Sequence, residues 1–108
     1  MTSLRENDLV LVPRNAHRST LTGVLLSGAR VAYYENPYDD EMGVYHAPTL
    51  EGVSAALALH PQARALFLTS PTYYGAAADV HSLTTLAHQR GLVVLVDEAW
   101  GPHLRFHP

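Results

Sequence analysis

The sequence contains no cysteine and no lysine, and each absence excludes a class of chemistry. Without cysteine, the chain can form neither a disulfide scaffold nor a cysteine-ligated zinc site. All seven basic residues are arginines, so this chain alone cannot complete a reaction that needs a lysine amine. No apolar run is long enough to span a membrane, and the polar start, MTSLRENDLV, does not resemble a signal peptide. The net charge of −3 gives no reason to expect nucleic acid or membrane partners, and a cytoplasmic location is expected.

The pattern of apolar residues along the 108-residue chain predicts one domain with alternating strands and helices. Helical spacing and capping residues predict three helices, and short apolar runs predict four strands, with a loop at 35–48. This alternation favours an α/β fold, namely a partial doubly wound, mostly parallel sheet with flanking helices. A layer this small is expected to leave an apolar edge or face uncovered. The expected strands are residues 9–12, 31–34, 65–68 and 92–96, and the helices lie near 21–28, 50–60 and 80–91.

The stretch LVVLVDEAWGPH, residues 92–103, places two carboxylates directly after a run of five apolar residues. Such a run predicts a strand buried on both faces, and open α/β sheets bind ligands at the carboxyl ends of such strands. Asp97 could therefore be the magnesium-holding acid of a P-loop enzyme, but no GxxxxGK motif is present. It could bind a metal together with His103 and His107, although Pro102 fits poorly with a helix that would align them. Asp97 could also simply cap the next turn.

A fourth interpretation makes Asp97 the carboxylate that keeps the pyridine nitrogen of a pyridoxal phosphate ring protonated. This interpretation requires a group that lies flat on the ring. His17, in the segment PRNAHRS after the first expected strand, could stack through its imidazole face, or it could simply begin a helix. Ala99 is two residues beyond Asp97, so in an extended segment it points to the same side and is small enough to lie against a ring.

The segments PRNAHRS, LTSPTYYG and LVDEAWGPHLRFHP, in this order and spacing, resemble the Orn/Lys/Arg decarboxylase family. The resemblance covers the chain from about Asp8 to Pro108. It implies a fold-type-I enzyme with an aminotransferase-like major domain, pyridoxal 5'-phosphate (PLP) as cofactor and a basic amino acid (arginine, lysine or ornithine) as substrate. It implies that His17 stacks on the cofactor ring, that Asp97 pairs with the pyridine nitrogen and that Ala99 packs on the opposite ring face.

The same resemblance implies further roles and also shows departures. Ser70 and Thr72 would contact the phenolic oxygen of the cofactor or nearby groups, although both are also common turn residues. His103 would face the active site, while the tyrosines in LTSPTYYG are expected to be packing residues. Arg18 stands where relatives commonly have lysine, and Trp100 stands where some have histidine.

The Schiff-base lysine of the family follows the DEAW motif by a few tens of residues, and a phosphate-binding loop precedes Asp8. We therefore expect residues 1–108 to form a single partial PLP-binding domain without these two segments, and not to be competent as an isolated chain. An aminotransferase or lyase of the same fold type remains an alternative. A second alternative is that the chain is a non-catalytic, truncated or partner-dependent fragment. The expected protein partner is another copy of the chain, in a homo-oligomer, or a complementing chain.

Overall fold

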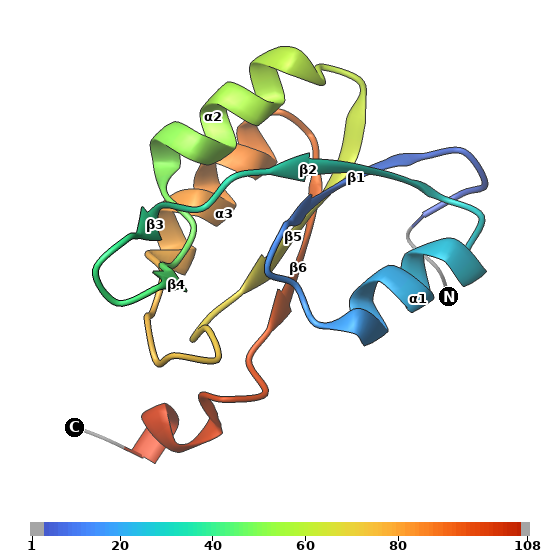
Figure 1. Ribbon diagram of the computed structural model, residues 1–108. Helices are drawn as coiled ribbons and strands as arrows, with labels where there is room; N and C mark the ends of the chain where they lie inside the picture. Colours follow the sequence, from blue (N-terminus) through green and yellow to red (C-terminus); the bar gives the residue numbers. More distant parts are fainter. Residues whose placement is uncertain (1–3, 107–108) are drawn as a thin grey trace.

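The computed structural model describes residues 4–106 and shows an α/β fold with a four-stranded parallel sheet (Figure 1). The strand order is β2-β1-β5-β6, and all three pairings are parallel. This architecture confirms the predicted α/β class, the four main strands and the three helices. The main elements are β1 (Leu9–Pro13), α1 (Arg18–Leu26), β2 (Arg30–Tyr34), α2 (Leu50–Leu59), β5 (Ala63–Thr69), α3 (Val80–Gln89) and β6 (Val93–Asp97).

Local hydrogen bonds begin the second and third helices where the sequence predicts them. The Thr49 side chain accepts a hydrogen bond from the Gly52 amide at 3.1 Å, and Asp79 accepts one from the Ser82 amide at 3.0 Å. Both side chains satisfy an amide that the first helical turn leaves free. The third helix ends before Gly91, whose φ of +73° is a conformation that glycine adopts without strain.

Helices cover the two faces of the sheet unequally. Helices α2 and α3 lie on one face, and α1 lies on the other (Figure 1). The larger core therefore forms under α2 and α3, where Leu66, Leu68 and Val53 are fully buried. The smaller core lies under α1 and includes Val10, Val12 and Val24. The described part of the chain carries a helix over only part of the second face.

The prediction that residues 35–48 form a plain loop is wrong. They contain a short antiparallel hairpin of β3 (Tyr38–Asp39) and β4 (Val44–Tyr45). The rings of Tyr38 and Tyr45 are cross-strand partners with centroids 4.8 Å apart. Gly43 has a φ of +68° in the turn between the two strands. Each strand is too short to show an alternating apolar pattern, which is why the sequence did not reveal them.

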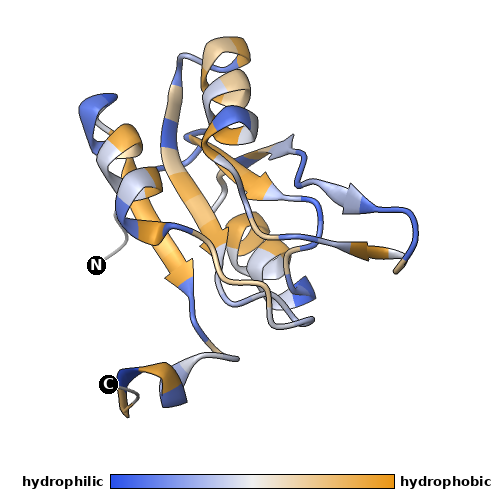
Figure 2. Ribbon diagram, turned by 90° about the vertical axis from the view of Figure 1, so that its left-hand side faces the viewer, coloured by the Kyte–Doolittle hydropathy of each residue, from blue (hydrophilic) through white to orange (hydrophobic). Residues whose placement is uncertain are grey.

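The prediction that β6 is buried on both faces is also wrong. In the described structure β6 pairs only with β5, so it is an edge strand. Val93 is 37% exposed and Leu95 is 39% exposed, because they lie on the same face of the sheet as α1 but in the part of it that α1 does not cover. Figure 2 shows β6, the strand that leads to the C-terminus, coloured as predominantly hydrophobic. The expected uncovered apolar face is therefore present, on this strand.

None of the helices within residues 4–106 is long and apolar enough to cross a membrane.

Candidate functional site

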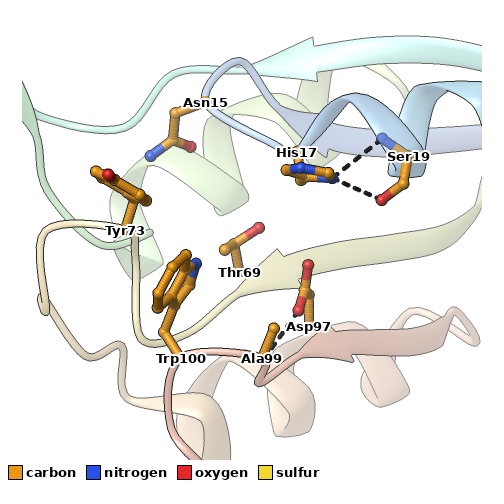
Figure 3. Close-up of a pocket in the computed structure, with 8 residues that line it drawn as sticks. All are labelled: Asn15, His17, Ser19, Thr69, Tyr73, Asp97, Ala99 and Trp100. Carbon is orange, nitrogen blue, oxygen red and sulfur yellow. Dashed lines mark hydrogen bonds between the residues drawn. The ribbon is translucent and has the colours of Figure 1, made fainter.

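A cavity of about 620 Å³ opens where the carboxyl ends of β1, β5 and β6 meet. It gathers residues from three segments that are far apart in the sequence (Figure 3). Because the carboxyl ends of parallel strands share one edge of a sheet, these segments reach the same place without long loops. The lining residues are Asn15, His17, Ser19, Thr69, Tyr73, Asp97, Ala99 and Trp100.

Asp97 is the last residue of β6 and presents a half-buried carboxylate to the cavity. Its Oδ1 accepts a hydrogen bond from the Ala99 amide at 3.0 Å, which fixes the orientation of the carboxylate. Its carbonyl accepts one from the Ser70 amide at 3.0 Å, which ties β6 to the end of β5. The turn-capping interpretation of Asp97 is therefore compatible with a ligand-binding one. One oxygen holds the turn, and the carboxylate as a whole still faces the cavity.

His17 lies on the opposite side of the cavity, at the residue that precedes α1. Its Nδ1 accepts a hydrogen bond from the Ser19 amide at 3.2 Å and lies 2.8 Å from the Ser19 hydroxyl. These two contacts fix the imidazole ring at the start of the helix. Figure 3 shows the ring across the cavity from Asp97 and Ala99. His17 thus begins the helix and also forms one wall of the cavity.

Thr69, the last residue of β5, is a lining residue that the sequence analysis missed. It is directly in register with Asp97 on the neighbouring strand. Its side chain is only 7% exposed, and its hydroxyl oxygen has no hydrogen-bond partner among the described residues. A buried hydroxyl without a partner is costly, so such groups are rare and point to an additional binding partner.

Asn15 also lines the cavity, and a buried neighbour fixes its amide. The side-chain amide of Asn36 donates one hydrogen bond to Asn15 Oδ1 at 3.0 Å and another to the carbonyl of His46 at 3.0 Å. Asn36 is only 6% exposed, so this arrangement is rigid. With its oxygen occupied, Asn15 has its amide nitrogen left to donate to a ligand in the cavity.

Two exposed aromatic side chains form the remaining wall. Tyr73 is 71% exposed and Trp100 is 56% exposed, and their rings meet edge to face with centroids 5.2 Å apart. The prediction that the tyrosines in LTSPTYYG are packing residues is therefore wrong. Aromatic residues left in solvent beside a cavity offer apolar surface to a ligand. Their position directly after the ends of β5 and β6 was the available sequence signal.

The structure does not bring every predicted site residue into the cavity. Ser70 and Thr72 are buried, and their hydroxyls accept hydrogen bonds within their own loop, from the Ala78 amide at 2.9 Å and the Ala76 amide at 3.2 Å. His103 is exposed and is not among the cavity-lining residues. The cavity thus combines His17, Asp97 and Ala99, while Ser70, Thr72 and His103 lie outside it.

His103 belongs to a 3₁₀ helix, Pro102–Phe106, at a place where Pro102 was expected to fit poorly with a helix. Proline is tolerated at the first helical position because the amide hydrogen it lacks would have no partner there. Within residues 4–106, no group of three histidine or acidic residues is close enough to hold a metal ion. His107, the other half of the suggested histidine pair, lies outside the described residues.

The charge of the cavity limits what it can bind tightly. Asp97 is the one carboxylate on its wall, and no arginine is among the lining residues described. The cavity can therefore neutralise a protonated ring nitrogen but offers no cation to a phosphate group.

Comparisons with known proteins identify the family and the fold of the chain. The profile of the family described as Orn/Lys/Arg decarboxylase, major domain, matches residues 1–108. The arginine decarboxylase of Bacillus subtilis is 44% identical over 100 residues, covering 93% of this chain and 20% of that protein. Lysine decarboxylase LdcA of Pseudomonas aeruginosa is 30% identical over 112 residues, covering 93% of this chain and 15% of that protein.

Among solved structures, aspartate aminotransferase of Thermus thermophilus has a TM-score of 0.71 at 23% identity, over 88% of this chain and 24% of that one. This likeness shows an aminotransferase-like fold. The chain spans about a fifth of the length of the Bacillus subtilis relative that it matches. Because the family profile matches all of residues 1–108, the chain belongs to the Orn/Lys/Arg decarboxylase family.

Proposed function

We propose that the cavity binds PLP and that this chain supplies the ring-binding part of a decarboxylase that acts on a basic amino acid. The observation that carries the proposal is the convergence of His17, Asp97 and Ala99 on one cavity. The family and the proteins of this fold are PLP-dependent in general, and the relatives named above are arginine and lysine decarboxylases. Arginine, lysine and ornithine are therefore the proposed substrates.

The described residues have the chemistry that the cofactor ring requires, and they line one cavity. Asp97 would hold the proton at the ring nitrogen, because a half-buried carboxylate stabilises a cation that it can hydrogen-bond. His17 would pack its imidazole against one ring face, and the methyl group of Ala99 would contact the other. When bound, PLP supplies an electron sink for the α-carbon from which the carboxylate leaves as CO2. The cavity volume lies within the usual range for small-molecule sites, about 300–1,000 Å³.

The absence of lysine limits what the isolated chain can do. A Schiff base to an enzyme lysine cannot form within this sequence, because it contains none. We therefore expect the purified chain alone to release no CO2 from arginine, lysine or ornithine beyond the rate with free PLP. Release that depends on Asp97 would overturn this part of the proposal.

Cofactor binding can be measured directly, because Trp100 is the one tryptophan and lies on the cavity wall. PLP should quench its fluorescence in a saturable manner. Asp97→Asn removes the charge and keeps the shape, so it should weaken PLP binding. A hydrogen bond to a charged group contributes about 1.5–3 kcal/mol, and the lower value suits a half-buried site, which corresponds to about a tenfold rise in Kd.

Glu98→Gln is the matched control. Glu98 is the next residue along the chain and carries the same charge, but it is exposed and does not line the cavity. The control should leave the Kd for PLP within about twofold of the original. If both variants weaken binding equally, the effect is one of net charge and the proposed ring contact is wrong. If the unchanged chain shows no saturable quenching, the cofactor assignment itself is wrong.

A further inference from the structure

We propose that Thr69 supplies the hydroxyl that hydrogen-bonds the phenolic oxygen of the ring, a role the sequence implied for Ser70 or Thr72. This inference rests on the proposed function and adds a binding residue to the same site. Its basis is that Thr69 lines the cavity, that the residue is only 7% exposed, and that its buried hydroxyl has no hydrogen-bond partner among the described residues. Figure 3 shows this hydroxyl between the aromatic wall and Asp97.

The three hydroxyls of this segment differ in what they already bind. The Ser70 hydroxyl accepts a hydrogen bond from the Ala78 amide, and the Thr72 hydroxyl accepts one from the Ala76 amide. Both therefore hold the loop closed, and although each hydroxyl still has a hydrogen to donate, neither residue is among those that line the cavity. The Thr69 hydroxyl has no such bond among the described residues, so it can bind a ligand at no cost to the loop.

The position of Thr69 suits the phenolic oxygen in particular. Thr69 and Asp97 are register partners on adjacent parallel strands, which lie about 4.8 Å apart. On the PLP ring, the carbon that bears the phenolic oxygen is separated from the nitrogen by one ring carbon. Groups that bind the nitrogen and the phenolic oxygen must therefore stand side by side along one edge of the ring. Asp97 and Thr69 stand in this relation.

The test compares two ligands and three forms of the chain. The ligands are PLP and its 3-deoxy analogue, which lacks the phenolic oxygen, and binding is followed through quenching of Trp100 fluorescence. Thr69→Val removes the hydroxyl and keeps the branched shape, while Thr69→Ser keeps the hydroxyl. We expect Thr69→Val to weaken PLP binding about tenfold and to leave binding of the 3-deoxy analogue unchanged within about twofold. Thr69→Ser should bind PLP within about twofold of the original chain.

The outcomes separate this inference from the function on which it rests. Equal weakening of both ligands by Thr69→Val, or weakening of neither, overturns the role of Thr69 and leaves the cofactor site standing. No saturable binding of PLP to the unchanged chain overturns both. Should Thr69→Val fail to give a cooperative unfolding transition, the comparison of Thr69→Ser with Thr69→Ala across the two ligands decides the question in the same way.

Discussion

The unpaired hydroxyl of Thr69 has a consequence for stability that does not depend on any ligand. Replacing Thr69 by valine exchanges that hydroxyl for a methyl group of nearly the same size in a side chain that is 7% exposed. Valine also suits the end of a β-strand at least as well as threonine does. We therefore expect Thr69→Val to raise the free energy of unfolding, although it removes a polar group from a ligand-binding cavity.

The size of the effect follows from two contributions of the same sign. A buried polar group without a partner costs about 1–3 kcal/mol, and the lower value suits a side chain at a cavity wall. A newly buried methyl group adds about 0.8 kcal/mol. The expected gain is thus about 1–2 kcal/mol. For a domain of this size, about 1 kcal/mol shifts Tm by roughly 4–8 °C, so the change is easily measured.

The assay is urea unfolding of the ligand-free chain followed by circular dichroism, with Thr72→Val as the matched control. Thr72 carries the same substitution three residues away and is 1% exposed, but its hydroxyl accepts a hydrogen bond from the Ala76 amide at 3.2 Å. Removing this bond leaves the amide without its partner and should lower the free energy of unfolding by about 1–2 kcal/mol. The two variants should therefore shift stability in opposite directions. A loss of stability in Thr69→Val comparable with that in Thr72→Val would refute the assignment of the Thr69 hydroxyl as unpaired.

Two further predictions concern the two sides of the sheet. The buried Tyr34 hydroxyl donates a hydrogen bond to the Phe67 carbonyl at 2.8 Å, so Tyr34→Phe should lower the free energy of unfolding by about 1 kcal/mol. Burial raises the pKa of Tyr34 far above its usual range, so the folded protein keeps the proton that the unfolded chain loses above about pH 10. The free energy of unfolding should therefore fall as the pH rises above about 10. The phenolate absorbance of Tyr34 should appear only when the protein unfolds. The Tyr34→Phe variant should lose less stability than the original chain over the same pH range. Leu95→Gln on the exposed face of β6 should reduce binding of the dye ANS while changing the free energy of unfolding by about 0.5 kcal/mol or less, whereas Leu66→Gln, at a fully buried position, should prevent folding.

Most of the fold could be predicted because its signals are local. Helical spacing, the capping side chains of Thr49 and Asp79, and the glycine after α3 all act within a few residues of the element they define. The hairpin at residues 38–45 was missed because each of its strands has only two residues. The exposure of β6 was missed for a different reason. An apolar run shows that a strand can be buried on both faces, but not which elements are present to cover it.

The residues of the candidate site were likewise only partly predictable from the sequence. That Asp97, His17 and Ala99 line one cavity could be predicted, because each follows the end of an expected strand and strand ends meet at one edge of a parallel sheet. The segment TSPT offers three hydroxyls at that edge, and the residue types alone do not say which of them faces the cavity. The answer depends on register. Thr69 pairs with Asp97, and register partners on neighbouring strands point to the same face of a sheet.

That register could not be read from the sequence, because the apolar runs at 65–68 and 92–96 fit together equally well in more than one alignment. Ser70 then follows on the opposite face, where its hydroxyl is occupied by the Ala78 amide. A one-residue shift between β5 and β6 would exchange the two positions and place Ser70 beside Asp97. The response of the chain to Thr69→Val with PLP and its 3-deoxy analogue therefore tests the strand register in solution as well as the role of one hydroxyl.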